Sequence, residues 1–289
     1  MEKVIRILKN ESGLEATSKF PFLDGKFDRV YKEKKYEFRF ASMHLEGKDE
    51  VTIRKASSMN EDSKLEDLRF PVPVIKLIRK VYLRDKLLLY GAQTGQGKTT
   101  TLMTILLEIN RETDKKILTI EDPPEYKIEK FTQVAIKRTE DEKYDVSYSK
   151  AIRGAMRADP DIVLIGEIRD EETAKETIKI ASSGHGVFST IHTGQVNQVK
   201  RRLLSLNLNE VDILETLGGI VVQQLIKSLC DNCKIKDGNV YKANTRLKNE
   251  CPHCKMSKGY QGRVPINEIA LFKTNMEDLT PPNFENYLS

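Results

Sequence analysis

One ten-residue segment constrains this chain more than any other. Gly91–Thr100 reads GAQTGQGKTT and stands between an apolar run, Leu87–Tyr90, and a helix-forming run, Thr101–Leu107. A glycine-rich turn between a strand and a helix directs successive backbone N–H groups inward as an anion-binding nest, and the helix N-terminus adds positive potential. We therefore predict a phosphate-binding loop in a strand–loop–helix unit.

The side chains of this loop predict Mg-ATP as its ligand. Lys98 is placed to reach the outer phosphates, and the Thr99 hydroxyl is placed to hold Mg²⁺. Ala92 occupies the place of the first glycine in the usual pattern G-x-x-x-x-G-K-[ST], with Gly91 displaced by one residue, so the backbone at Ala92 needs a negative φ. The alternative is a structural glycine-rich turn before a helix. The expected nucleotide-binding residues are Ala92, Gln93, Thr94, Gly95, Gln96, Gly97, Lys98, Thr99 and Thr100.

Beyond this loop, apolar strand-like runs alternate with helical patterns. The runs cover 86–91, 116–121, 162–166 and 187–191, and the helical patterns cover 98–110, 147–157, 171–183 and 210–227. Such alternation indicates an α/β fold with a covered, mostly parallel sheet.

The ends of the chain have a different character from this core. Residues 1–54 contain short β-like runs, Val4–Leu8 among them, and predict a small α+β module; residues 55–72 lose periodicity and predict a linker. The core is then expected over 73–229, a cysteine-containing subdomain over 230–272 and a short tail over 273–289.

Acidic and polar residues follow three of the predicted strands. Glu167 ends the run that begins at Ile162, where a carboxylate can act as the general base for a water that attacks the γ-phosphate; the alternative is a surface glutamate. Glu121 ends another run and can polarise water or hold Mg²⁺ through water, because the carboxyl ends of parallel strands meet at the ligand crevice. The third run ends in Ser189, Thr190 and His192, which are candidate sensors of the γ-phosphate.

Four cysteines occur as two C-x-x-C pairs, Cys230 with Cys233 and Cys251 with Cys254. Two such turns each present two thiolates, and a tetrahedral Zn²⁺ accepts both pairs, so the spacing favours a structural Cys₄ zinc site. A redox or disulfide function is the alternative.

Composition excludes some classes of function. The 289 residues include 48 Lys and Arg against 43 Asp and Glu, which gives a net charge of +5 without a basic block. Trp is absent, and no platform of aromatic side chains for nucleic acid stands out. The apolar runs are too short to cross a bilayer and no leader is evident. We therefore expect a cytoplasmic protein with no direct nucleic-acid binding.

Taken together, these segments resemble the secretion ATPase superfamily, specifically the assembly-type ATPases of type II secretion and type IV pili. The loop resembles the Walker A motif, Ile120–Tyr126 the aspartate box, Arg157–Asp170 the Walker B motif and Gly184–Thr193 the histidine box. The resemblance implies a RecA-like P-loop NTPase fold with catalytic Glu167, assisted by Glu121.

The same resemblance assigns roles to further charged residues. Arg39 and Arg54 fall where family arginines reach the nucleotide from the N-terminal domain, and Arg153 and Arg157 match two further arginine positions. His185 and His192 fall on the box histidines, which couple nucleotide state to domain movement. For each arginine the alternative is a solvated surface charge.

The resemblance covers residues 12–272, and it implies a chain shortened at both ends that begins inside the second N-terminal domain. Gln224 replaces a family arginine. Retraction-type relatives typically lack the cysteine module, so its presence favours extension or secretion.

We expect a cytoplasmic, hexameric ATPase at the inner membrane, where it drives a platform protein and thereby pilus, pseudopilus or DNA-uptake assembly. Its membrane association would be peripheral, through the partner, and its cofactors would be ATP, Mg²⁺ and Zn²⁺. Two alternatives stay open: a catalytically weak nucleotide-binding regulator that joins rings of a full-length relative, and a conjugative or DNA-translocating ATPase.

Overall fold

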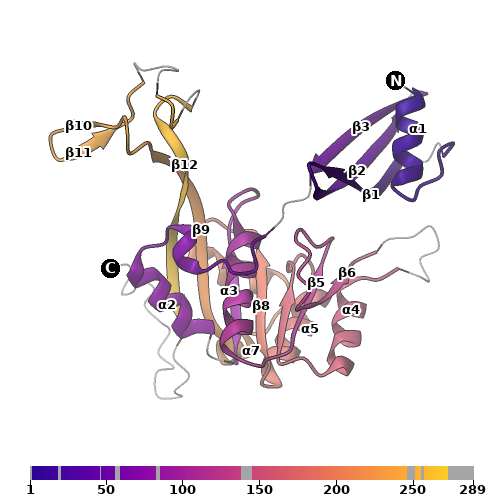
Figure 1. The fold of residues 1–289 in the computed structure, drawn as a ribbon. Helices are drawn as coiled ribbons and strands as arrows, with labels where there is room; N and C mark the ends of the chain where they lie inside the picture. Colours follow the sequence, from indigo (N-terminus) through magenta and orange to yellow (C-terminus); the bar gives the residue numbers. More distant parts are fainter. Residues whose placement is uncertain are drawn as a thin grey trace. The chain divides into compact units, whose positions relative to one another are not determined.

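The computed structural model describes residues 2–18, 21–45, 47–55, 59–82, 85–137, 145–245, 251–254 and 257–272. The chain forms two compact units, which consist of Met1–Met59 with Glu125–Lys127 and of Asn60–Pro124 with Ile128–Ser289. Figure 1 labels their helices and strands. The expected tail, residues 273–289, lies outside the described residues.

The first unit consists of one helix and a three-stranded antiparallel sheet. Helix α1 spans Glu2–Glu11, and strands β1 (Phe22–Tyr31), β2 (Lys34–Leu45) and β3 (Lys48–Lys55) pair in that order. The segment after α1 approaches β1 closely, since a Cβ added to Gly25 would lie 2.7 Å from the Ser12 Cβ. Glycine at this position therefore allows the helical segment to pack on one face of the sheet.

The prediction of a strand at Val4–Leu8 is wrong, because these residues lie in α1. Ile5 and Leu8, three residues apart, are partly buried, whereas Val4 and Ile7 are 54% and 49% exposed. The apolar residues thus follow a helical period, and a five-residue apolar run by itself does not distinguish that period from a strand.

A buried ion pair joins α1 to the sheet. The Lys9 ammonium, only 2% exposed, donates to Asp49 Oδ2 at 2.8 Å and to the Ser18 carbonyl at 3.1 Å. His44 Nδ1 lies 2.8 Å from the other Asp49 oxygen. The hydrogen bond from Lys9, together with His44, lowers the pKa of the Asp49 carboxyl.

The second unit is built on a seven-stranded sheet in the order β12-β9-β4-β8-β7-β5-β6. Its strands are β4 (Leu87–Gly91), β5 (Ile117–Glu121), β6 (Thr132–Ala135), β7 (Ile162–Ile165), β8 (Gly186–Ile191), β9 (Leu217–Leu229) and β12 (Tyr260–Leu271). All pairs are parallel except β9 with β12. β4, β5, β7 and β8 are buried along their whole length, so both faces of the sheet are covered there. The predicted α/β class is confirmed.

Helices connect these strands. They are α2 (Val72–Tyr82), α3 (Lys98–Glu112), α4 (Tyr148–Ala155), α5 (Glu171–Ser182), α6 (Val196–Ser205) and α7 (Glu210–Thr216), with 3₁₀ turns η1 (Leu65–Leu68) and η3 (Met156–Ala158). Three of them, α3, α4 and α5, correspond to the helical patterns expected at 98–110, 147–157 and 171–183.

The prediction of one helix over 210–227 is wrong for most of its length. The observed helix, α7, ends at Thr216, and the chain continues as strand β9. Gly218 and Gly219 disfavour a helix, and the three β-branched residues at 220–222 favour a strand. A Cβ on Gly218 would also lie 2.7 Å from the Lys86 Cβ, so the strand passes close to the chain entering β4.

Much of the stretch expected to be a linker, 55–72, packs on the second unit. Leu65 is fully buried, and its N–H donates to Glu108 Oε2 on α3 at 3.3 Å. Arg111 on the same helix donates to the carbonyls of Glu61 and Ser63 at 2.6 and 2.8 Å. Arg79 of α2 completes the network through ion pairs with Glu108 and Glu66. Charged side chains near the end of α3 thus hold residues 61–65 in place, although the sequence of that stretch has no periodic pattern that predicts a helix or strand.

β9 and β12 form a long antiparallel ribbon that extends past the other strands (Figure 1). Their register runs from Leu271 opposite Gly219 to Tyr260 opposite Leu229. The far end of the ribbon carries the cysteines and a small hairpin of β10 (Ile235–Asp237) and β11 (Val240–Lys242). In the part of the chain that the structure describes, no helix combines the length and apolar character needed to cross a bilayer.

The ion pair between Lys9 and Asp49 yields a stability prediction. In Lys9→Ala the Asp49 carboxylate loses its buried partner, which is expected to lower the free energy of unfolding of the first unit by about 3 kcal/mol. Because the folded-state pKa of Asp49 is lowered, this contribution is present above the ordinary pKa of 3.8 and is lost as the pH falls through the lower, folded value. Amide hydrogen exchange of β1–β3 in the full chain measures it, with exposed Lys3→Ala as control. Equal exchange in both variants would contradict the prediction.

Candidate functional site

The phosphate loop lies at the end of β4, as the sequence predicts. Gly95 and Gly97 both have φ of +77°, a conformation that favours glycine. Ala92 is buried and its φ is not positive, so alanine meets no backbone strain in the place of the usual first glycine. Gly91 is required for a different reason, because a Cβ there would lie 2.8 Å from the Thr193 methyl group.

Four charged or titratable side chains meet beside the loop. Lys98 Nζ donates to the Ala92 carbonyl at 3.2 Å and lies 3.5 Å from His192 Nδ1. His192 Nε2 lies 3.4 Å from Glu167 Oε2, and the other oxygen of Glu167 is ion-paired with Arg169. The loop lysine and the predicted base are thus joined through one imidazole.

The protonation of His192 follows from its neighbours. An ammonium only donates, so the arrangement fits a ring in which Nδ1 accepts from Lys98 and Nε2–H points toward Glu167. Desolvation lowers the pKa of His192, and the charges of Lys98 and Arg169 lower it further. The imidazole is therefore neutral at neutral pH.

Packing between β7 and β8 positions Glu167. Ser189 donates to the Ile165 carbonyl at 2.8 Å and Thr190 to the Gly166 carbonyl at 2.6 Å, both from buried positions on β8. A Cβ on Gly166 would lie 2.7 Å from the Tyr148 hydroxyl and 3.1 Å from a backbone carbonyl. Ser189 and Thr190 therefore hold the end of β7, and a role in sensing the γ-phosphate stays a prediction.

Glu121 lies at the end of β5 and is 5% exposed. Its Oε1 accepts from Thr119 at 2.8 Å and from Gln133 at 3.2 Å. Because β5 is next to β7 and parallel to it, Glu121 and Glu167 lie at the same edge of the sheet.

Two further predicted residues, His185 and Arg157, lie away from this edge within the chain, and a third, Arg153, is paired with a neighbouring helix. His185 directly precedes β8, hence at the opposite edge, where its Nδ1 lies 2.8 Å from Ser183 Oγ. Arg157 lies in η3, before β7, and is exposed. Arg153 of α4 forms ion pairs with Glu172 and Glu176 of α5.

The two arginines of the first unit lie side by side. Arg39 on β2 is directly opposite Arg54 on β3 and opposite Lys26 on β1. Alternation along the strands places this row of three cations on the face of the sheet opposite Gly25, hence away from Ser12.

Sequence reasoning missed two residues that contact the loop from the ribbon. Gln223 on β9 donates to the Gln96 carbonyl at 2.6 Å, and Arg263 on β12 donates to the Gly95 carbonyl at 3.2 Å. No spacing rule links either residue to the loop, because the ribbon is remote from it in sequence.

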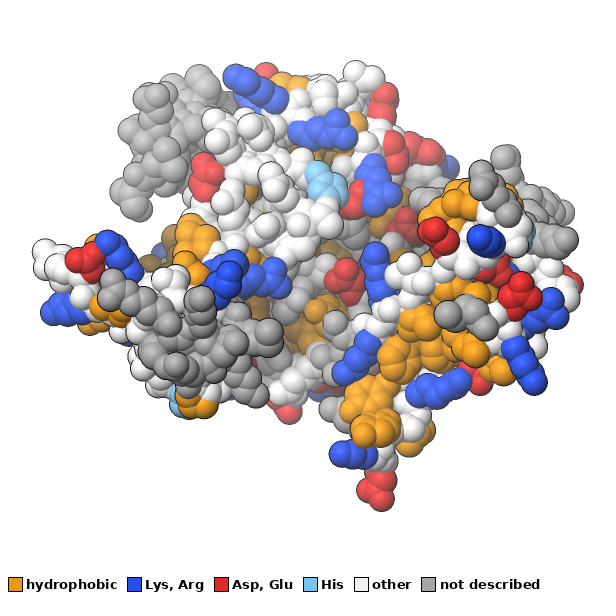
Figure 2. All heavy atoms as spheres, turned by 90° about the horizontal axis from the view of Figure 1, so that it is seen from above, with side chains coloured by type: hydrophobic (Ala, Val, Ile, Leu, Met, Phe, Trp, Pro, Cys, Tyr) orange, Lys and Arg blue, Asp and Glu red, His pale blue; other side chains and the backbone are white. Residues whose placement is uncertain are grey.

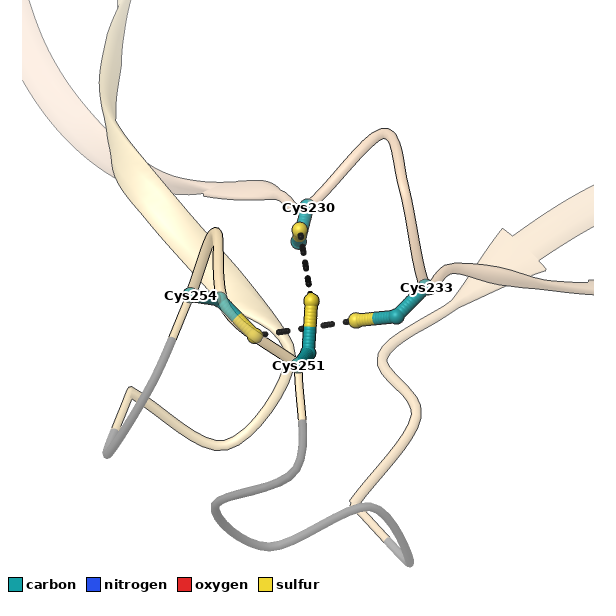
Figure 3. A group of neighbouring side chains, drawn as sticks. All are labelled: Cys230, Cys233, Cys251 and Cys254. Atoms are coloured by element: carbon teal, nitrogen blue, oxygen red, sulfur yellow. Dashed lines mark hydrogen bonds between the residues drawn. The ribbon is translucent and has the colours of Figure 1, made fainter.

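The four cysteines converge at the far end of the ribbon (Figure 3). All are buried and their Sγ atoms lie within 4.8 Å of one another. The Cys230–Cys251 and Cys233–Cys254 separations are 3.9 and 3.6 Å, far beyond the ~2.05 Å of a disulfide.

This geometry suits a tetrahedral metal ion. Four sulfurs at ~2.3 Å from a common centre are separated from one another by roughly 3.8 Å, close to the distances observed. Backbone hydrogen bonds from Cys254 and His253 lower the pKa of the Cys251 thiol to about 7, whereas burial raises the pKa of the Cys233 and Cys254 thiols, so the fit to a metal rests on the positions of the sulfurs. The donor set therefore fits zinc.

Comparison with known proteins identifies the family that this chain resembles. The family model described as "Type II/IV secretion system protein" matches residues 4–286. The type IV pilus assembly ATPase PilB of Pseudomonas aeruginosa is 31% identical over 281 residues, which cover 91% of this chain and 48% of PilB. The putative type II secretion system protein E of Escherichia coli K12 is 35% identical over 201 residues, 65% of this chain and 40% of that protein.

Solved structures agree on the fold. The pilus retraction motor PilT with bound ADP aligns with a TM-score of 0.63 at 25% identity, covering 96% of this chain and 69% of PilT. The Legionella pneumophila ATPase DotB aligns with a TM-score of 0.62 at 24% identity, covering 87% of this chain and 63% of DotB. The chain spans about two fifths to one half of the length of the curated relatives described here.

The cysteine cluster predicts one zinc ion per chain. Cys251→Ser removes one of four thiolates and is expected to abolish stoichiometric zinc and to raise amide exchange in residues 230–245. Elemental analysis and exchange measured by mass spectrometry test this prediction, with His253→Ser as control because four thiolates already complete the shell. Full zinc content in Cys251→Ser would contradict the assignment.

Proposed function

The chain belongs to the type II/IV secretion system protein family, and from this membership we propose that it hydrolyses Mg-ATP as a cytoplasmic motor. The motor would power pilus or pseudopilus assembly, protein secretion or DNA uptake at the inner membrane. The observation that carries the proposal is the meeting of Lys98, His192 and Glu167 beside a phosphate loop at one edge of a parallel sheet. This arrangement supports nucleotide hydrolysis, because it combines an anion nest with a carboxylate base.

The loop residues supply binding. In the proposal, backbone N–H groups of residues 92–100 cradle the phosphates, and Lys98 leaves the Ala92 carbonyl to contact the outer phosphates. Thr99 is the second residue of α3, directly after Lys98, so its hydroxyl is placed to hold Mg²⁺. The metal ion supplies charge neutralisation on the transferring phosphoryl group.

Glu167 supplies the base in the proposed reaction. Its carboxylate accepts a proton from a water whose oxygen bonds to the γ-phosphorus, while the bond from that phosphorus to the bridging oxygen breaks. To do so, Glu167 gives up its ion pair with Arg169. Neutral His192 orients the carboxylate without adding a competing positive charge, and Glu121 polarises water at the same edge.

Arginines complete the site in the proposal, as the resemblance implies. Arg39 and Arg54 stabilise charge on the transferring phosphoryl group. Arg157 lies before β7, at the edge of the sheet opposite the loop, and Arg153 is paired with α5, so we propose that both act at the loop of a neighbouring copy in a hexameric ring. His185 couples nucleotide state to movement.

The cysteine centre and the partner complete the proposal. The four cysteines hold structural Zn²⁺ at the tip of the ribbon. The motor would associate peripherally with the cytoplasmic face of the inner membrane through a platform protein, without binding nucleic acid directly.

The base assignment gives a direct test. Glu167→Gln keeps the size of the side chain and removes its ability to accept the proton, so turnover is expected to fall by about two orders of magnitude or more while ATP binding persists. Lys98→Ala is expected to weaken ATP binding itself. ATP hydrolysis by zinc-replete protein, measured over a concentration series with oligomer mass recorded on the same samples, distinguishes the two; exposed Glu112→Gln is the control.

Other outcomes would favour the alternatives. Equal, negligible rates for the unmodified chain and Glu167→Gln, with ATP still bound, would favour a regulator that joins rings of a relative. Stimulation of hydrolysis by DNA would favour a translocase. Against the latter, basic and acidic side chains are interspersed over the face shown in Figure 2.

A further inference from the structure

A buried polar cluster lies directly beneath the phosphate loop. Its centre is the Gln223 side chain on β9, which is 1% exposed. Gln223 Oε1 accepts from the Tyr90 hydroxyl at 2.9 Å and from the Thr101 hydroxyl at 3.1 Å, and Nε2 donates to the Gln96 carbonyl at 2.6 Å. Tyr90 and Thr101 are equally buried, at 0% and 2% exposure. Strand β4, helix α3 and the loop are thus joined through one amide.

The chemistry of the partners fixes the orientation of this amide. The Gln96 carbonyl only accepts, so the Gln223 amide must present its NH₂ group to it. The oxygen of the amide then faces Tyr90 and Thr101, whose hydroxyls both donate. Both ends of the Gln223 amide therefore face partners of the right kind, and the opposite orientation would leave the Gln96 carbonyl without a donor from this side chain.

This contact determines where the next N–H of the loop points. In a trans peptide the C=O of one residue and the N–H of the next point in opposite directions. Because the Gln96 carbonyl is held toward β9, the Gly97 N–H is directed away from β9. That peptide joins Gln96 to Gly97, whose φ is +77°, and stands directly before α3.

The ribbon contacts the loop at two more points, once at Gln96 and once at its neighbour Gly95. The Leu225 N–H donates to the Gln96 side-chain oxygen at 2.6 Å, and Arg263 donates to the Gly95 carbonyl at 3.2 Å. A Cβ on Gly97 would lie 3.1 Å from Gln223 Nε2, so the loop backbone rests against this side chain. Of the three donors, only Gln223 is a side chain wholly enclosed beneath the loop.

We propose that Gln223 is a positioning residue for nucleotide binding: by holding the Gln96 carbonyl, it aims the Gly97 N–H at the phosphates. The inference rests on the proposed nucleotide function and deepens it, since it names a residue outside the loop that sets the loop's affinity. Gln223 itself contacts neither the nucleotide nor the attacking water.

Two substitutions at this position separate positioning from packing. Gln223→Met fills the space without a donor, and Gln223→Glu places an acceptor against the Gln96 carbonyl. Both are expected to raise the dissociation constant of ATP about tenfold at about pH 8, because both remove the one hydrogen bond from this side chain that reaches the loop. Amides of residues 95–98 are expected to exchange faster in protein without added nucleotide.

The pH dependence gives a readout that packing alone would not produce. Burial raises the pKa of a carboxyl group, and the carboxyl group that Gln223→Glu introduces can, once protonated, again donate to the Gln96 carbonyl. Lowering the pH to about 6 is therefore expected to return the ATP affinity of Gln223→Glu toward that of the unmodified chain, while Gln223→Met stays weak. Gln224→Glu, the same change on the exposed neighbour, is the matched control and is expected to change neither quantity.

A milder variant keeps the test decisive if the substitutions at Gln223 do not fold. Tyr90→Phe retains the ring and removes one hydrogen bond to Gln223 Oε1. It is expected to raise the dissociation constant by a smaller factor in the same direction, and its effect is expected to vanish when it is combined with Gln223→Met.

The outcomes distinguish this inference from the proposed function. If the unmodified chain does not bind ATP, the proposed function fails, while exchange at residues 95–98 still reports whether Gln223 holds the loop. If the chain binds ATP and Gln223→Met matches Gln224→Glu in affinity and exchange, the positioning role is overturned. Uniformly faster exchange throughout the second unit would assign Gln223 a packing role and would also overturn it.

Discussion

The parallel pairing of β4, β8, β7 and β5 is the constraint on which the site depends. Because these strands run in one direction, the segments that follow them emerge at one edge of the sheet. That single fact brings together Lys98, His192 and Glu167 from three distant parts of the sequence, with Glu121 at the same edge. It also explains why the polar residues of β8 are buried: Ser189 and Thr190 satisfy carbonyls at the end of β7 and so fix the direction in which Glu167 leaves the sheet.

The strands and helices of the α/β core could be predicted from the sequence because each has an unambiguous local pattern. Ile162–Ile165 is a continuous apolar run between polar residues, and α5 follows with Asp170 as its cap. Prediction failed where a local pattern fits two structures or where distant contacts decide. The apolar residues of Val4–Leu8 fit the pattern of a strand and that of a helix equally well. Lys9 is buried only because Asp49, forty residues later, supplies its counter-charge. Residues 60–71 have no period of their own, yet Leu65 is buried because Glu108 and Arg111 on α3 bind the backbone around it.

For the site, sequence reasoning reached the residues that touch the reaction more readily than those that hold them. Lys98 and Glu167 stand in motifs whose chemistry can be derived from neighbouring residues alone. The four cysteines were also accessible, since C-x-x-C turns bring their own ligands together in pairs. By contrast, Arg169, two residues after Glu167, carries no sign in the sequence that it is paired with the predicted base. The role of Gln223 is harder still to predict, because its partners lie on β4, α3 and the loop, and no sequence pattern around residue 223 indicates these contacts.

The wrong prediction of a helix over 210–227 shows why the secondary structure of this stretch matters to the site. In a strand, residues 223 and 225 share a side, and both lie against Gly97, while Gln224 between them is exposed. In a helix the two would point about 200° apart, and one segment could not supply both contacts. As a strand of 13 residues, β9 also has the length to leave the sheet and end directly before Cys230. The strand that supports the loop from below is therefore the same strand that enters the cysteine centre, so the local choice of strand over helix determines the surroundings of both sites.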